Sequence, residues 1–173
     1  RIPDGHDSPF DISTAIELDD FELPELRRLA VGLGADQQTT ARMTQAVWDW
    51  TRGQPYLSQK VFRALARRTN AELTEELVDE VVETLFISPG GPREEPHLSA
   101  VSQEILRESA GRSARLSLYR RILKGRRIEA DPGIDIHRDL LLTGLVVIGA
   151  EGTFLLRNRL YEVAFTPQWI SHN

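Results

Sequence analysis

A stretch rich in Pro and Gly near the middle of the chain most limits what this sequence can fold into. Residues 88–96 read SPGGPREEP, with three Pro and two Gly in nine positions. Proline removes a backbone donor and glycine adds conformational freedom, so we expect neither a helix nor a strand to cross this stretch. The sequence therefore predicts two structural units, over residues 22–88 and 97–173, joined by a linker at 89–96.

Short amphipathic stretches before the linker predict helices. Apolar residues recur at helical spacing in 24–33, 43–50, 56–66 and 77–85. Asp36 and Thr74 are typical N-cap residues, and Pro24 and Pro55 suit the first turn of a helix. The first unit is therefore expected to be a helical bundle.

The second unit combines predicted helices with two predicted strands. Helices are expected at 98–106, at 113–123 with Ser113 as its cap, and at 134–142. Two β-like runs follow, 145–148 and 153–156, and the four residues between them suit a hairpin loop. A last short helix is expected at 160–165. Three helices followed by a hairpin is the order of a winged-helix domain, so the predicted fold is mainly α with a small β-hairpin wing.

Composition excludes several functions. The chain has 173 residues, 40% of them hydrophobic, and no Cys, which excludes disulfides and a cysteine nucleophile. No apolar run reaches about 18 residues and no secretory signal is visible, so we expect a cytoplasmic protein without a membrane partner. Its four His lack the spacing of a zinc site, and no Ser lies in a hydrolase motif. Because residue 1 is Arg, we expect the chain to be part of a longer protein.

Three segments together resemble one protein family. WTRGQPYLSQKVF (50–62) resembles the Gly-x-Pro segment in the helical lid of bacterial AAA-like ATPases of the signalling (STAND) class. LLTGLVVIGAEGTFLLRNRLYEVAF (141–165) resembles the wing and following helix of their winged-helix domain. The segment SPFDISTAIELDDFELPEL (8–26) resembles the exit from their P-loop core. The resemblance implies a remnant strand and loop of that core at 1–21, a lid at 22–88 and a winged helix at 97–173.

The catalytic half of that family is missing here. No G-x-x-x-x-G-K-[ST] loop occurs, and neither does an apolar strand ending in an Mg²⁺-binding Asp. We therefore expect no ATP hydrolysis and no cofactor in this chain alone, and ATP or ADP with Mg²⁺ in the full-length protein. The resemblance implies a non-catalytic regulatory half that senses bound nucleotide. Its partners would be the P-loop core and the fused sensor or output domains, and a homo-oligomer is compatible with this role.

Two short motifs carry the implied nucleotide contacts. In the family, the Gly-x-Pro segment faces the nucleotide, and here it is Gly53, Gln54 and Pro55. The same residues could simply end one helix and begin the next. Asn158 and Arg159 stand where related proteins carry a polar pair that senses the bound diphosphate. An Arg fork suits phosphate or carboxylate, but Arg159 could also be an ordinary surface residue.

A basic segment supports a rival interpretation. A winged helix can bind DNA, and a contact with DNA or with another domain could use six residues: Arg115, Arg120, Arg121, Lys124, Arg126 and Arg127. DNA binding is not favoured, because the net charge is −5 and Glu151 lies at the expected wing tip. The segment could instead pair with the acidic fourth helix or with another domain. A third alternative is a protein–protein adaptor that uses Trp48, Trp50 or Trp169.

Overall fold

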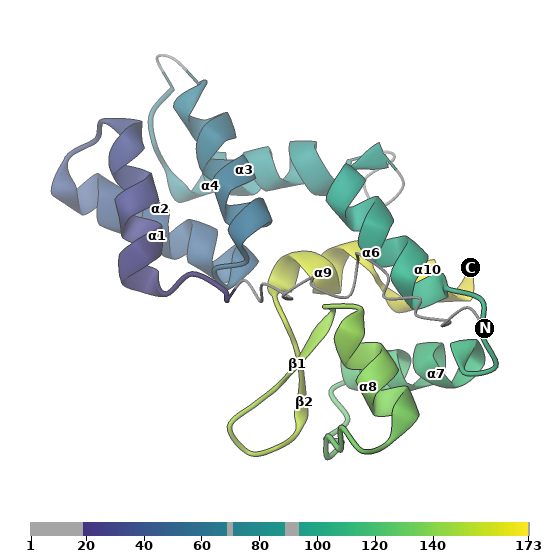
Figure 1. The fold of residues 1–173 in the computed structure, drawn as a ribbon. Coiled ribbons are helices and arrows are strands. Elements are labelled where there is room, and N and C mark those ends of the chain that lie inside the picture. Colours follow the sequence, from purple (N-terminus) through teal and green to yellow (C-terminus); the bar gives the residue numbers. More distant parts are fainter. Residues whose placement is uncertain (1–18, 69–70, 89–93, 173) are drawn as a thin grey trace, which may run out of the picture.

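The computed structural model describes residues 19–68, 71–88 and 94–172, and these are mainly helical (Figure 1). Two groups of elements follow one another. The N-terminal group consists of α1 (Leu23–Ala30), the 3₁₀ turn η1 (Val31–Leu33), α2 (Gln37–Thr51), α3 (Pro55–Ala66), α4 (Glu75–Val82) and the π-helical turn η2 (Glu83–Ile87). The C-terminal group consists of α6 (Pro96–Leu106), α7 (Arg112–Leu123), α8 (Asp135–Leu142), β1 (Val146–Ile148), β2 (Phe154–Leu156), α9 (Arg159–Ala164) and α10 (Pro167–Ser171).

The N-terminal group is the predicted helical bundle. The Asp36 carboxylate accepts from the backbone N–H groups of Gln38 and Thr39, at 2.9 and 3.0 Å, which confirms it as the cap of α2. The Thr74 hydroxyl caps α4 in the same way, through the Leu77 N–H. The apolar faces of these helices meet in a core of fully or nearly fully buried side chains, among them Leu26, Met43, Val47, Leu57, Val61, Phe62 and Val78.

The C-terminal group confirms the predicted order of three helices and a hairpin. β1 and β2 are antiparallel, with Val146 opposite Leu156 and Ile148 opposite Phe154. Glu129 forms a bridge to Thr153, which extends the pairing of the second strand on its other side. The cap prediction for α7 was wrong: the helix begins at Arg112 after Gly111, so Ser113 lies inside the first turn.

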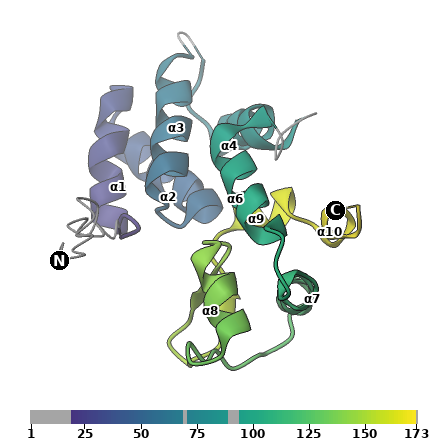
Figure 2. The same cartoon turned by 45° about the vertical axis from the view of Figure 1, so that its right-hand side comes forward.

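The two groups share one hydrophobic core. α9 lies between them and contacts α2 and η2 on one side and β2 on the other (Figures 1 and 2).

The short helix α10 is not among the predicted elements. Thr166 caps it through the Trp169 N–H at 3.2 Å, and Pro167 occupies its first turn. The strand expected at the start of the chain and most of the linker lie outside the described residues.

Gly53 closes the turn between α2 and α3 in a way that no other residue type allows. Its φ is +81°, in the left-handed region. A Cβ added here would lie 2.1 Å from the Phe21 carbonyl oxygen and 2.9 Å from the Trp48 ring. The Gly53 carbonyl accepts from the Phe21 N–H at 2.8 Å, which fixes the segment before α1 against this turn.

The substitution Gly53→Ala should therefore destabilise the fold by about 2–4 kcal/mol, since strain at φ and a steric clash act together. Gly34 is a matched control, because its φ is +68° but a Cβ there would meet nothing within 4 Å. Gly34→Ala should cost only about 1 kcal/mol. Urea unfolding of both variants measures the difference, and equal losses would contradict the packing argument.

Candidate functional site between the two helical groups

The junction between β2 and α9 faces the C-terminal end of α2 across a surface hollow. This hollow has a volume of about 460 Å³ and is lined by Asp49 and Arg52 from α2 and its cap, and by Leu156, Asn158, Arg159 and Glu162. The structure thus brings the predicted pair, Asn158 and Arg159, next to the N-terminal group. Arg52 is an additional cation here, held in the left-handed region with φ of 50° as the C-cap of α2.

Arg159 points toward the N-terminal group. Its guanidinium carbon lies 3.9 Å from the centroid of the Trp50 ring, a cation–π contact between α9 and α2. The indole N–H of Trp50 donates to Asp79 at 2.6 Å, so the ring is fixed from α4 as well. Stacking leaves the N–H groups at the guanidinium edge free to meet an anion in the hollow.

Asn158 contributes a buried polar group to the same hollow. The residue is 3% exposed, and its Oδ1 accepts from the Tyr161 N–H at 2.9 Å as the cap of α9. Among the described residues, its Nδ2 has no hydrogen-bond partner. A buried donor without a partner costs about 1–3 kcal/mol, so this amide carries an uncompensated cost at the junction between β2 and α9.

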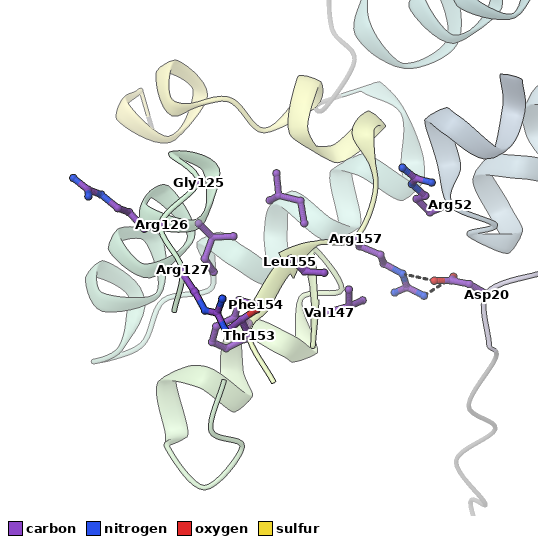
Figure 3. Close-up of a pocket in the computed structure, with 12 residues that line it drawn as sticks. Asp20, Arg52, Gly125, Arg126, Arg127, Val147, Thr153, Phe154, Leu155 and Arg157 are labelled. Atoms are coloured by element: carbon purple, nitrogen blue, oxygen red, sulfur yellow. Dashed lines mark hydrogen bonds and ion pairs between the residues drawn. The ribbon is translucent and has the colours of Figure 1, made fainter. Parts of the chain in front are cut away.

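A second arginine of this junction was not predicted. The Arg157 fork donates to the Asp20 carboxylate through Nε at 3.1 Å and Nη2 at 2.7 Å (Figure 3). Burial alone would lower the pKa of Arg157, but the hydrogen bond and charge of Asp20 raise it. The pair ties the segment before α1 to β2. Only the fold could reveal it, because 137 positions separate the two residues.

The Gly-x-Pro residues do not line this hollow. Gly53 and Gln54 are buried, and the Gln54 Oε1 caps α3 by accepting from the Leu57 N–H at 2.6 Å. Pro55 is half-buried in the first turn of α3. The interpretation that these residues end one helix and begin the next accounts for Gly53 and Gln54 fully. A nucleotide-facing role for the three stays a prediction.

Arg115 must be removed from the proposed contact surface. The residue is 0% exposed, and its guanidinium holds the end of α6 by donating to the Ile105 carbonyl at 3.0 Å and the Arg107 carbonyl at 2.6 Å. It also lies 3.8 Å from Asp139 of α8. An interior clamp of this kind cannot reach DNA or another domain.

The other basic residues remain near the surface. Arg120 is half-buried, and Arg121, Lys124, Arg126 and Arg127 are exposed. Arg127 pairs with Glu151 at the hairpin tip, at 3.1 Å, and Arg138 of α8 pairs with Asp135. Within the described residues, none of these five cations has an ion pair with α4, so the expected pairing with the acidic fourth helix is not observed for them. The carboxylates beside these cations also weaken the case for a DNA surface.

A polar joint, formed by Tyr56, Lys60, Glu95, His97 and Tyr161, connects the two groups around the buried carboxylate of Glu95. Glu95 is 5% exposed, and its Oε1 accepts from the Lys60 ammonium and the Tyr56 hydroxyl, each at 2.7 Å. Its Oε2 accepts from the Leu98 N–H at 2.7 Å and so caps α6. Burial raises the pKa of the Glu95 carboxyl, but the hydrogen bonds from Lys60, Leu98 and Tyr56 and the charge of Lys60 together outweigh burial and lower it.

His97 extends this joint to α9. Its ring stacks on Tyr56 with centroids 4.9 Å apart, and its Nε2 lies 2.7 Å from the Tyr161 hydroxyl. Burial lowers the pKa of His97, and Lys60 and Arg157 act in the same direction while Glu95 opposes them. The ring is therefore held neutral at the meeting point of α3, α6 and α9.

Comparison with known proteins finds one marked similarity. The chain is 30% identical over 172 residues to an uncharacterised WD repeat-containing protein of Synechocystis sp.. The alignment covers 95% of this chain but only 14% of that protein. No protein-family model matches the chain, and no solved structure matches it.

Two general features of the described residues bear on the site. None of their helices is long and apolar enough to cross a membrane. Within the same residues, no three or more His, Asp or Glu side chains are grouped so that they could hold a metal ion. The polar groups that line the hollow are those of Arg52, Arg159, Asn158, Asp49 and Glu162.

Glu95→Gln should destabilise the protein by about 1–3 kcal/mol, because the partly buried Lys60 ammonium loses its counter-charge. Lys60→Met should be destabilising too, since it leaves a carboxylate that is almost fully buried. The double variant should recover part of the loss, which a double-mutant cycle of urea unfolding measures as a coupling energy. Strictly additive effects would show that the two groups do not interact.

The stability of the fold should fall as pH decreases below about 6.5, the ordinary pKa of His, because the folded state holds His97 with a lowered pKa. As pH falls, His97 takes up a proton in the unfolded chain before it does so in the folded protein. The contribution of neutral His97 to stability is therefore fully present above about pH 6.5 and is lost as pH falls toward the lowered pKa of His97 in the folded state. His97→Gln should flatten this part of the profile. His172→Gln, at an exposed position, is the matched control, and thermal unfolding between pH 5 and pH 8 is the measurement (roughly the range of His titration).

Proposed function

We propose that this chain is the non-catalytic regulatory half of a STAND-type ATPase. The N-terminal group would be the lid and the C-terminal group the winged helix of that switch. The observation that carries the proposal is the position of Arg159: its guanidinium lies on Trp50 at the lid, and the residue lines a hollow with Arg52 and Asn158. Two cations from the two sides of one junction suit a phosphate group.

The switch would act through the relative position of lid and winged helix. A nucleotide changes such an equilibrium only if it binds one arrangement more tightly than the other. Arg52 comes from the lid, whereas Asn158 and Arg159 come from the winged helix, so an anion held by all three favours the arrangement seen here. Loss of that anion would remove the preference and free the winged helix to signal. Asp49 and Glu162 also line the hollow and would weaken binding of an anion without a metal.

The similarity to the Synechocystis protein supports the expected context of the chain. That protein is described as WD repeat-containing, and the aligned region is 14% of its length. We propose that this chain likewise belongs to a longer polypeptide, in which WD repeats receive or transmit the signal. Repeats of this kind form β-propellers, whose rigid surfaces suit partner binding.

The first test is the coding sequence upstream of residue 1. The proposal requires a Walker P-loop there, and its absence would refute it. Where the P-loop is present, Arg159→Gln in the longer protein should accelerate release of a fluorescent ADP about tenfold, because about 1.5 kcal/mol of charge-assisted hydrogen bonding is lost.

Arg138→Gln provides the matched control for that measurement. Arg138 is an exposed arginine of α8, paired with Asp135 and outside the hollow. Its substitution should leave ADP release unchanged. If Arg159→Gln and Arg138→Gln release ADP at the same rate, Arg159 does not sense the phosphate.

A further inference from the structure

The outer face of α3 borders a second hollow that the proposed function does not use. Its volume is about 600 Å³, and it is lined by Tyr56, Gln59, Lys60, Arg63, Ala64, Arg67 and Leu85. Three of these residues are cations, at positions 60, 63 and 67. Residues three and four apart lie on the same side of a helix, so all three face one region of space.

Two of these cations are not neutralised. Arg63 and Arg67 are exposed, and among the described residues neither has an ion-pair partner. Their neighbour Arg68 shows the contrast, because it pairs with Glu80 at 3.2 Å. The helix dipole favours cations in the last turn of α3 in general, but it does not require them to line the same hollow. Like charges at this spacing repel, so the arrangement carries a small cost that an anion would remove.

Lys60 connects this hollow to the polar joint around Glu95. Its ammonium has three N–H donors, of which one points to Glu95 at 2.7 Å and one to the Tyr56 hydroxyl at 3.4 Å. The ammonium also lies 5.4 Å from the Tyr56 ring centroid and 5.3 Å from that of Phe86. Two acidic residues lie beside it: Glu95, which Lys60 neutralises, and Glu94, which lines a smaller hollow together with Lys60.

We propose that the hollow on α3 binds a small polyphosphate anion. Arg63 and Arg67 would hold its oxygens with their planar forks, and the Lys60 ammonium would add a point charge. Ala64 and Leu85 form an apolar wall on one side. Lys60 also holds Glu95, the cap of α6, so the site lies next to the joint between the two helical groups. The site is separate from the hollow at Arg159 and does not depend on nucleotide sensing there.

The test is calorimetric titration of the whole chain with inorganic pyrophosphate at constant ionic strength. Binding should be saturable, and Arg63→Gln and Arg67→Gln should each weaken it at least about fivefold, as expected for loss of one charge-assisted contact. The double Gln variant should lose this binding. Arg42→Gln, an exposed arginine on α2 away from the hollow, should bind like the unmodified chain.

Thermal unfolding gives the second readout. Pyrophosphate should raise the unfolding midpoint of the unmodified chain but not of the double Gln variant, since a ligand that binds only the folded state stabilises it. Arg63→Lys with Arg67→Lys keeps the charge, should retain part of the affinity, and shows that the loss is not a folding defect.

Two results would overturn the inference. The first is the absence of saturable pyrophosphate binding in the unmodified chain. The second is binding that survives the double Gln variant but is lost in Arg52→Gln with Arg159→Gln, which would place the anion in the other hollow. That second result would overturn the α3 site but not the proposed function. Likewise, the absence of binding at α3 does not contradict phosphate sensing by Arg159.

Discussion

The arrangement of the two helical groups depends on the buried carboxylate of Glu95. Its two oxygens hold Lys60 and Tyr56 of α3 and the first turn of α6 at once. A carboxylate that is 5% exposed is tolerated only because every one of these donors is in place. Since the donors come from two groups, the same interaction that stabilises α6 also sets its direction relative to α3.

The two hollows have no lining residue in common, and both are built across elements. At one, Arg52 from the N-terminal group meets Asn158 and Arg159 from the C-terminal group. At the other, Lys60 belongs to both the hollow and the joint. Anions at either place would act on the same quantity, the relative position of the two groups. An ion pair between Arg157 and Asp20 fixes a third point of contact, where the chain reaches α1.

Much of the fold could be predicted because it depends on local chemistry. The caps Asp36 and Thr74, the hairpin around residues 149–152 and most helix boundaries follow from short patterns. Where the prediction differs from the structure, the cause is local as well. The prediction of Ser113 as a cap is wrong because the N-cap of α7 is Gly111, two positions earlier. Helix α10 has its own local signal, with Thr166 as the cap and Pro167 in the first turn. Of the residues predicted to contact nucleotide, Asn158 and Arg159 line the hollow beside the N-terminal group, whereas Gly53 and Gln54 form the turn between α2 and α3. Their role toward nucleotide stays a prediction.

The sequence by itself determined the helices, their order and the hairpin, because periodicity, caps and turn residues act over a few positions. Only the tertiary structure decided which charges are functional candidates. Arg115 lies in a basic segment of the sequence, yet its side chain is buried and holds the end of α6. Arg157 pairs with Asp20, and Arg52 lines a hollow with Asn158 and Arg159, so the neighbours of both arginines are far away in the chain. Burial and pairing are properties of the folded neighbourhood, so a charge pattern read along the chain cannot distinguish a buried arginine from a binding one.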